Sequence, residues 1–253
     1  MSHYIEKVTV SLENLISELA RNPSLFLKNP DTDFSRNRKI NFKTCVGITM
    51  NSGGCTLNKE LLDFFDFDVN APTVSAYTQQ RAKILPEAFE YLFHAFTEEN
   101  AQTKNLYEGY QLLACDGSNL TIAPNLNDPE TLWKSNQLGA TGNHLHLNAL
   151  TSFHAKKVDY IKQEIFARLA LYNYCELITT YVVEHTENIS KKNQVNFTIA
   201  IYICREYLRR KRKLRPPDVV KLIEKHILPI RPGRRDPRKV KLQASVSFLY
   251  RVA

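Results

Sequence analysis

The sequence lacks the features that direct a chain into or across a membrane. No apolar run approaches the roughly 18 residues that a membrane-spanning helix requires, and the start, Met1-Ser2-His3-Tyr4, has no basic segment followed by an apolar core. The five cysteines are an odd number, and none of them form a Cys-x-x-Cys pair. A disulfide framework and a zinc site are therefore not expected. These absences predict a cytoplasmic protein in a reducing compartment, without a membrane partner.

What is present is the composition of an ordinary globular protein. Hydrophobic residues make up 43% and charged residues 24% of the 253 positions, and there is no internal repeat or low-complexity tract. A chain of this length buries about 70–75% of its unfolded surface, so cross-links are not needed for stability. The length is compatible with one large domain or two small ones.

Charge is divided unevenly along the chain. Residues 1–150 hold 12 Lys and Arg against 17 Asp and Glu, whereas residues 151–253 hold 22 Lys and Arg against 9 Asp and Glu. The net charge of +8 thus conceals an acidic first part and a strongly basic second part. Such an asymmetry favours contact between the second part and a polyanion, and the alternative is a surface that is merely solvated.

Apolar residues at steps of three and four predict several helices. The first runs over Val8–Leu19 and stops before Pro23, and residues 22–42 are polar and irregular. The same spacing predicts further helices over 57–65, 72–84, 86–96, 155–184, 197–209 and 218–227. The helices over 72–84 and 86–96 loosely resemble a helix-turn-helix, in which the first would present a polar face of Gln79, Gln80, Arg81 and Lys83.

The stretch Leu112–Leu120 holds the most informative carboxylate. A short apolar run leads to Asp116, and Gly117 and Ser118 then end the run, which is typical of a buried strand. A carboxylate is costly to bury in a strand unless it is paired or holds a metal ion. The alternative is an aspartate that only opens a turn, because Asp-Gly is a common turn dipeptide.

Residues 144–150 alternate with period two and predict a strand that carries His144 and His146 on one face. Two histidines at this spacing could bind a metal ion. No third ligand lies nearby in the sequence, so a solvent-facing or hydrogen-bonded pair is the alternative.

Four stretches follow one another in a characteristic order: Arg81-Ala82-Lys83-Ile84 leading into Phe89–Phe96, then Leu113–Ser118, then His146–Leu150, and finally Phe153–Lys157 with Gln163–Leu169, followed by Pro229–Arg234. In this order they resemble the cut-and-paste DDE transposases of bacterial insertion sequences. The likeness runs over most of the chain. No single stretch is diagnostic, and the order carries the resemblance.

The resemblance implies a ribonuclease-H-like core in which three carboxylates hold two divalent metal ions. Two metal ions about 3.5–4 Å apart stabilise the attacking and leaving oxygens of phosphoryl transfer. Mg²⁺ is the ion expected, because it prefers oxygen ligands. On this resemblance Asp116 is the first catalytic carboxylate and a ligand of Mg²⁺.

The chain departs from the family pattern after Leu150. The second aspartate should follow a later core strand, and the glutamate should lie on a helix just before Phe153–Lys157, but Leu150 is joined almost directly to that stretch. The pattern is that of an internal deletion. The remaining acids, such as Asp159, Glu164 and Glu176, fall on helices whose matching family positions are not catalytic. A single carboxylate cannot hold two Mg²⁺ ions, so we expect no DNA cleavage or joining by this chain alone.

The sequence thus predicts a mixed α/β, predominantly helical fold. It comprises an N-terminal helical domain (1–104, with possible DNA binding), a truncated ribonuclease-H-like core (105–154) and a C-terminal helical basic region (155–253).

The expected function is that of a catalytically incomplete DNA transposition protein, with element ends as the DNA partner and a homodimer or a heterodimer with an intact transposase as possible assemblies. The alternatives are a non-catalytic regulator of an intact transposase and a basic nucleic-acid-binding adaptor. The candidate DNA-binding residues are Arg209, Arg210, Lys211, Arg212, Lys213, Arg215, Arg231, Arg234, Arg235, Arg238 and Lys239.

Overall fold

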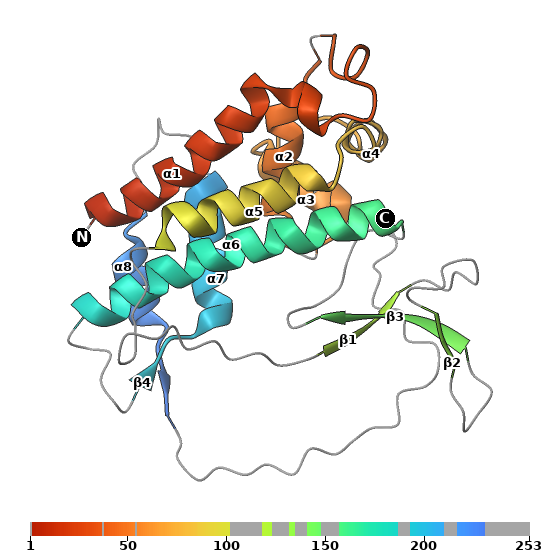
Figure 1. Ribbon diagram of the computed structural model, residues 1–253. Helices are drawn as coiled ribbons and strands as arrows, with labels where there is room; N and C mark the ends of the chain where they lie inside the picture. Colours follow the sequence, from red (N-terminus) through yellow and green to blue (C-terminus); the bar gives the residue numbers. More distant parts are fainter. Residues whose placement is uncertain are drawn as a thin grey trace.

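A computed structural model of the chain describes residues 2–36, 38–53, 55–101, 118–122, 132–134, 141–147, 157–186, 193–209 and 217–230. Helices predominate among these residues, and the strands are short (Figure 1). The helices are α1 (Ser2–Arg21), η1 (Pro23–Phe26, a 3-10 helix), α2 (Phe42–Asn51), α3 (Leu57–Phe64), α4 (Val74–Arg81), α5 (Glu87–Glu99), α6 (Val158–His185), α7 (Phe197–Arg209) and α8 (Val219–Lys225). The strands are β1 (Ser118–Ile122), β2 (Leu132–Lys134), β3 (Thr141–Leu147), β4 (Asn193–Gln194) and β5 (Leu228–Pro229). None of the described helices is long and apolar enough to cross a membrane.

The periodicity of the sequence placed most helices well and missed two, the short 3-10 helix η1 and one α-helix. α6 and α7 lie within a few residues of the predicted ranges, and Asp218 caps α8 by accepting a hydrogen bond from the Lys221 amide. The missed α-helix is α2. Its N-terminus is fixed by Asn41, whose side chain accepts a hydrogen bond from the Thr44 amide at 2.8 Å, a common N-cap arrangement.

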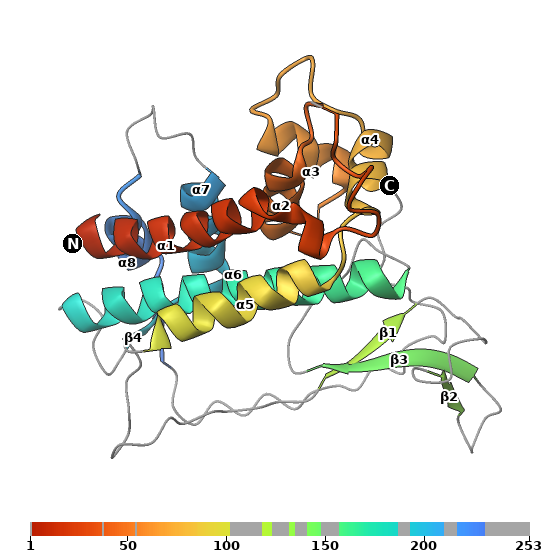
Figure 2. The ribbon, with the colours of Figure 1, turned by 45° about the horizontal axis from the view of Figure 1, so that its top comes forward.

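α6 is the centre of the helical part. It packs most extensively on α5, and also on α1, α2, α7 and α8. Figures 1 and 2 both show α5 and α6 side by side, with α1 and α2 on one side of the pair. Apolar residues surround most of its circumference, so it can contact several helices at once. The helices before residue 101 and those after residue 157 therefore share one hydrophobic core.

Two buried tyrosines connect the helices by hydrogen bonds between their side chains. The Tyr174 hydroxyl on α6 shares a hydrogen bond with Thr9 Oγ1 on α1 at 2.8 Å, and the Tyr77 hydroxyl on α4 shares one with Thr49 Oγ1 on α2 at 2.8 Å. Both rings are fully buried, so each phenol has the polar partner that its burial requires.

Three of the strands form an antiparallel sheet in the order β1-β3-β2. Ser118 lies opposite Leu147 and Ile122 lies opposite Asn143, so β1 pairs with β3 along its whole length. The prediction that Gly117 and Ser118 end a strand was wrong for Ser118, which begins β1. Pairing with Leu147 of β3 holds Ser118 in a strand, because strand formation depends on the partner strand more than on local preference.

Candidate nucleic-acid interface and its supporting ionic networks

Of the predicted DNA-binding residues, the structure describes Arg209, the last residue of α7. The predicted catalytic and metal-binding Asp116 lies outside the described residues. So do the other members of the basic clusters: Arg210, Lys211, Arg212, Lys213, Arg215, Arg231, Arg234, Arg235, Arg238 and Lys239. The structure shows the surroundings of Arg209, the residue that directly precedes the rest of the first basic cluster in the sequence.

Two arginines of α7 hold the C-terminal ends of two other helices. Arg209 donates through Nη1 to the carbonyl oxygen of Asp63 near the end of α3, and through Nη2 to both carboxylate oxygens of Glu206 at 2.9 Å. Arg205, one turn earlier, donates to the carbonyl oxygen of Asn51, the last residue of α2. A cation at a helix C-terminus satisfies orphan carbonyls and opposes the negative end of the helix dipole.

Glu60 completes this arrangement from the start of α3. Its Oε1 accepts hydrogen bonds from the amides of Gly53 and Cys55 at 2.9 and 2.8 Å, and its Oε2 lies 3.4 Å from Nη2 of Arg205. The connection between α2 and α3 is thereby tied to α7. A Cβ atom at Gly53 would run into the Arg205 guanidinium, so any larger residue here would force the end of that side chain to shift.

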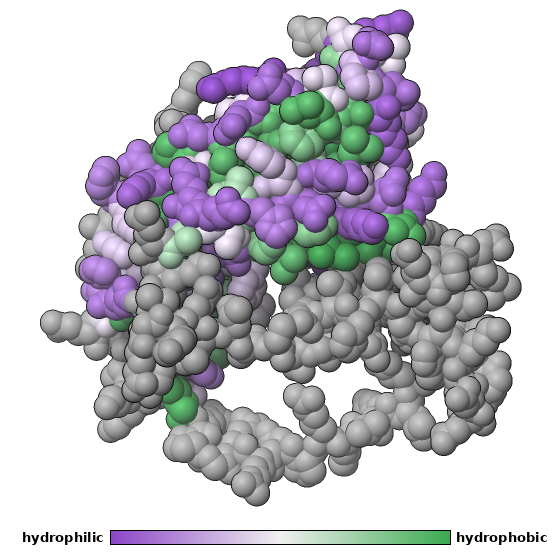
Figure 3. All heavy atoms as spheres, in the orientation of Figure 1, coloured by the Kyte–Doolittle hydropathy of each residue, from purple (hydrophilic) through white to green (hydrophobic). Residues whose placement is uncertain are grey.

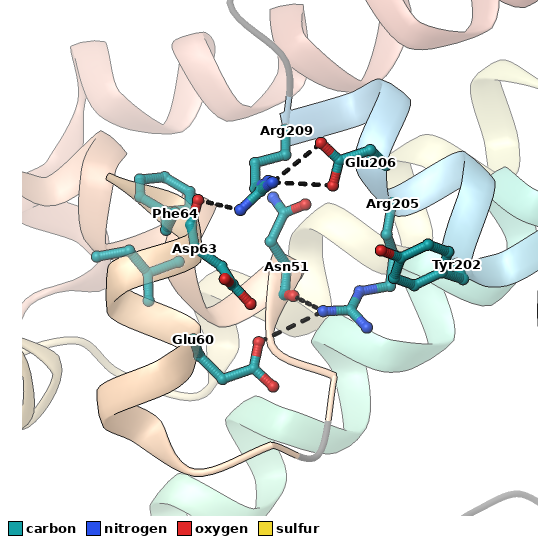
Figure 4. Close-up of a pocket in the computed structure, with 9 residues that line it drawn as sticks. Asn51, Glu60, Asp63, Phe64, Tyr202, Arg205, Glu206 and Arg209 are labelled. Atoms are coloured by element: carbon teal, nitrogen blue, oxygen red, sulfur yellow. Dashed lines mark hydrogen bonds and ion pairs between the residues drawn. The ribbon is translucent and has the colours of Figure 1, made fainter. Parts of the chain in front are cut away.

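The side chains of this region line a cavity of about 110 Å³ between α7 and the α2–α3 pair (Figure 4). Figure 4 shows the two arginines entering it from α7 and the carboxylates of Glu60 and Asp63 facing them from α3. Among the described residues, two buried polar atoms here have no hydrogen-bond partner: Nε of Arg205 and Oδ1 of Asn51. The cavity carries charges of both signs, and its arginines are engaged with groups of the same chain.

A second ionic network connects α4 with α6 in the interior. Arg81 Nε donates to Gln163 Oε1 at 2.7 Å, and its Nη1 donates to Glu164 Oε1 at 2.9 Å. Its Nη2 donates to the carbonyl oxygen of Tyr160, and Gln163 Nε2 donates to the carbonyl oxygen of Ile84 at 2.7 Å. The side chains of Arg81 and Glu164 are only 5% and 2% exposed.

The pKa directions agree with this geometry. Desolvation is the largest influence on Arg81 and lowers its pKa, but Tyr77 and the hydrogen-bonded Glu164 outweigh it, so the pKa is raised. Arg168 lies on α6, the helix of Glu164, and its Nη2 is 3.8 Å from Glu164 Oε2. Burial lowers the pKa of Arg168, and the negative charge of Glu164 opposes that fall. Glu164 is thus a structural counter-ion between two arginines.

The predicted polar face of the helix-turn-helix is only partly at the surface. Gln79 is exposed and donates to the Ser75 hydroxyl at 3.1 Å, whereas Gln80 and Arg81 are 4% exposed and face the core. The prediction that Gln80 and Arg81 belong to an exposed polar face was wrong. α4 also ends at Arg81, three residues earlier than predicted, because the Ala82 and Lys83 amides close its last turn.

The remaining acids do not assemble into a metal site within the described part of the chain. Asp159 forms an exposed salt bridge with Lys28 at 2.8 Å, Glu164 is held between arginines, and Glu176 lies on the outward side of α6. Among the described side chains there is no cluster of three or more His, Cys, Asp or Glu that could hold a metal ion. His144 and His146 both lie on β3, opposite Thr121 and Asn119.

No family model matches this chain, and no curated protein or solved structure matches it significantly. The geometry and the sequence therefore carry the functional argument by themselves.

Sequence reasoning missed the role of both networks. The sequence pattern assigns Arg205 to a helix and places Gln163 and Glu164 in one of the four stretches, but it predicts no partner for any of the three side chains. Polar residues at core-facing positions of a periodic helix were the available signal, since such residues require partners when they are buried. Those partners lie about 80 and 150 positions away in the sequence and could not be read from it.

Proposed function

We propose that this chain is a DNA-binding protein related to the DDE transposases and catalytically incomplete, acting on the ends of an insertion element without cutting them. The observation that supports the relationship most directly is the contact between two of the stretches that carry the resemblance. Arg81–Ile84 and Gln163–Leu169 are joined by the buried hydrogen bonds of Arg81 and Gln163. A chance likeness gives no reason for these two stretches to meet.

The antiparallel sheet supports the same relationship at the level of the core. The resemblance assigns its first core strand to the stretch around Asp116 and its next to His146–Leu150. β1 begins two residues after Asp116 and pairs with β3, which ends at Leu147. A ribonuclease-H-like core requires such neighbouring strands. We propose that this sheet is the remaining part of such a core.

Catalytic incompleteness follows from the short connection between β3 and α6. β3 ends at Leu147 and α6 begins at Val158, so residues 148–157 alone separate them. This segment is too short for a further core strand and a helix that would carry the second and third carboxylates. Mg²⁺ bound through one carboxylate lacks the paired metal arrangement that in-line phosphoryl transfer requires.

DNA binding is assigned to the basic segment that starts at the end of α7 and to the basic residues after 230. If these clusters neutralise about six phosphates, affinity for DNA falls about 10³-fold between 50 and 200 mM salt. Contacts of this kind give affinity without sequence preference. The exposed face of α4 with Gln79 is a second surface for DNA contact, among the helices before residue 101.

The test is a salt titration of binding to a labelled random-sequence duplex by fluorescence anisotropy. The steep salt dependence should become shallower when Arg210, Lys211, Arg212 and Lys213 are changed to Gln. A matched control variant changes four exposed cations elsewhere, Lys7, Arg21, Lys59 and Lys225, to Gln, and should keep most of the slope. Equal losses in both variants would argue against an assigned DNA-binding segment.

Catalysis is tested separately by incubating the pure protein with supercoiled plasmid and Mg²⁺. We expect the plasmid to stay intact. Metal-dependent nicking that disappears in Asp116→Ala would show an active centre and would overturn the catalytic part of the proposal. A non-catalytic regulator differs from an inert remnant by competition: it lowers the occupancy of element ends by an intact transposase.

A further inference from the structure

The cavity between α7 and the α2–α3 pair holds hydrogen-bonding groups that the described part of the chain does not satisfy. Nε of Arg205 is a buried donor and Oδ1 of Asn51 is a buried acceptor, and neither has a partner among the described residues. The orientation of the Asn51 amide is fixed, because its Nδ2 donates to the carbonyl oxygen of Gly47 at 3.0 Å. Buried polar groups of this kind call for a water molecule or a ligand.

The charges around the cavity favour a cation. Its lining holds three carboxylates and two guanidinium groups, which belong to Glu60, Asp63, Glu206, Arg205 and Arg209. Both guanidinium groups already donate to acceptors of this chain. The Asp63 carboxylate, in contrast, makes no hydrogen bond or ion pair with another described residue, and Figure 4 shows it pointing into the space between α3 and α7. An anion would meet this excess of negative charge, whereas a cation with N–H groups finds acceptors.

The donors and acceptors of the cavity narrow the ligand to one chemical class. A primary ammonium group has three N–H donors, enough for both the Asp63 carboxylate and Oδ1 of Asn51. The buried donor at Nε of Arg205 requires an acceptor on the same ligand, which a bare metal ion does not have. A hydroxyl oxygen supplies it. The cavity of about 110 Å³ has room for only a few non-hydrogen atoms, since a water molecule takes about 30 Å³ of the liquid.

The cavity is reached from the side of α7. Tyr202 is 64% exposed and the Glu206 side chain is 47% exposed, and both line the cavity. In Figure 1, α3 and α7 lie behind α5 and α6, so the face of mixed hydrophilic and hydrophobic side chains in Figure 3 is not the side of entry. A small molecule can therefore enter past α7 without displacing the helices that form the front of the molecule.

We propose that this cavity binds a small amino alcohol in its ammonium form. The ammonium group donates to the Asp63 carboxylate and to Oδ1 of Asn51, and the hydroxyl oxygen accepts from Nε of Arg205. Because these residues lie on α3, α2 and α7, the ligand stabilises the junction of the three helices. Binding depends neither on DNA nor on the proposed relationship to the transposases.

The test is a titration of the ¹⁵N-labelled full-length protein with ethanolamine hydrochloride, followed by amide NMR shifts near neutral pH at constant ionic strength. A ligand of four non-hydrogen atoms has limited affinity, so we expect saturable binding with a dissociation constant of about 1 mM. The shifts should change most at the C-terminal ends of α2 and α3 and on α7. Ethylene glycol lacks the charge and tetramethylammonium lacks N–H donors, so neither should bind saturably. An equal response to tetramethylammonium would show a general ionic effect and contradict the proposal.

Two variants with the same change of charge test the position of the ligand. Asp63→Asn keeps the shape of the side chain and removes its charge, so the dissociation constant should rise at least about tenfold. Asp68→Asn lies in the exposed connection between α3 and α4, outside the cavity lining, and should change the constant by less than about twofold. Far-UV circular dichroism checks that both variants keep the fold.

Three outcomes would overturn the proposal. The first is the absence of saturable ethanolamine binding to the unchanged protein, which would mean that water alone fills the cavity. The second is an equal loss of affinity in Asp63→Asn and Asp68→Asn, which would indicate attraction to the acidic surface as a whole. The third is unchanged affinity in Asp63→Asn, which would place the ligand elsewhere.

Discussion

At the scale of single residues, Arg81 and Arg209, two cations that the sequence places on candidate binding faces, hold helices together in the structure. Arg81 directs all three of its donating nitrogens at acceptors on α6, and its guanidinium also lies 5.2 Å from the centre of the Tyr160 ring. Burying an arginine and a glutamate is costly, and the cost is offset when the remaining hydrogen-bonding groups are satisfied. Here Gln163 provides that completion, because it accepts from Arg81 and donates to Ile84.

Breaking this network should be strongly destabilising. Arg81→Met keeps most of the side-chain volume but leaves Glu164 without its closest counter-ion, so we expect the free energy of unfolding to fall by about 3–5 kcal/mol. Lys28→Met removes the cation of an exposed pair with Asp159, where the side chains are 38% and 50% exposed, and should change stability by less than about 1 kcal/mol. Urea unfolding of the two variants measures the difference. Similar losses of unfolding free energy in the two variants would contradict a stabilising role of the buried Arg81 network.

At the scale of elements, long helices were predictable and short ones depended on their context. The stripe of apolar residues in α1 and the continuous apolar character of α6 are local properties, and a window of the sequence reveals them. α2 has mixed residues over Phe42–Asn51, and its helical state depends on the Asn41 cap and on burial against α6. Tertiary contact decided this segment, as it decided the start of β1.

The candidate site was predictable in its charge and not in its geometry. The basic character of the segment after α7 follows from composition. That Arg209 reaches the end of α3 is a consequence of how α7 packs against α2, which lies about 150 positions earlier. Contacts over such sequence separations cannot be derived from residue spacing on a single helix.

Through the hydrogen bonds of Arg205 and Arg209 to carbonyl oxygens, α7 supports the C-terminal ends of α2 and α3. In Arg205→Ala combined with Arg209→Ala, the carbonyls of Asn51 and Asp63 lose their charged donors, and each such hydrogen bond contributes on the order of 1–3 kcal/mol. Because both side chains are about a fifth exposed, water replaces part of this loss. We expect faster amide hydrogen exchange at the C-terminal turns of α2 and α3, with α1 and α5 unchanged. The control variant combines Lys221→Ala with Lys225→Ala on the surface of α8. Uniformly faster amide exchange in all helices of the arginine variant would contradict a local effect on α2 and α3.

At the scale of the whole molecule, the acidic first part and the basic second part do not correspond to two separate cores. α6 contacts α1, α2 and α5 from the first part and α7 and α8 from the second. The side chains buried between them belong to one cluster. Each part alone would expose the apolar surface that the other covers, so the two parts complete one helical body.

One core predicts one cooperative unfolding transition, and the cysteines can report it from both parts. Cys45 on α2, Cys175 on α6 and Cys204 on α7 are fully buried. Burial raises the pKa of the Cys45 thiol to about 12, and the hydrogen bond with Cys204 and burial raise that of Cys175, so neither forms the reactive thiolate in the folded protein near pH 8. A short pulse of iodoacetamide in increasing urea, followed by peptide mass spectrometry, should therefore show all three becoming reactive at the same midpoint. Cys55, which is partly exposed, should react earlier and serves as the internal control. Separate midpoints for Cys45 and Cys204 would mean that the two parts unfold independently, in contradiction to a shared core built around α6.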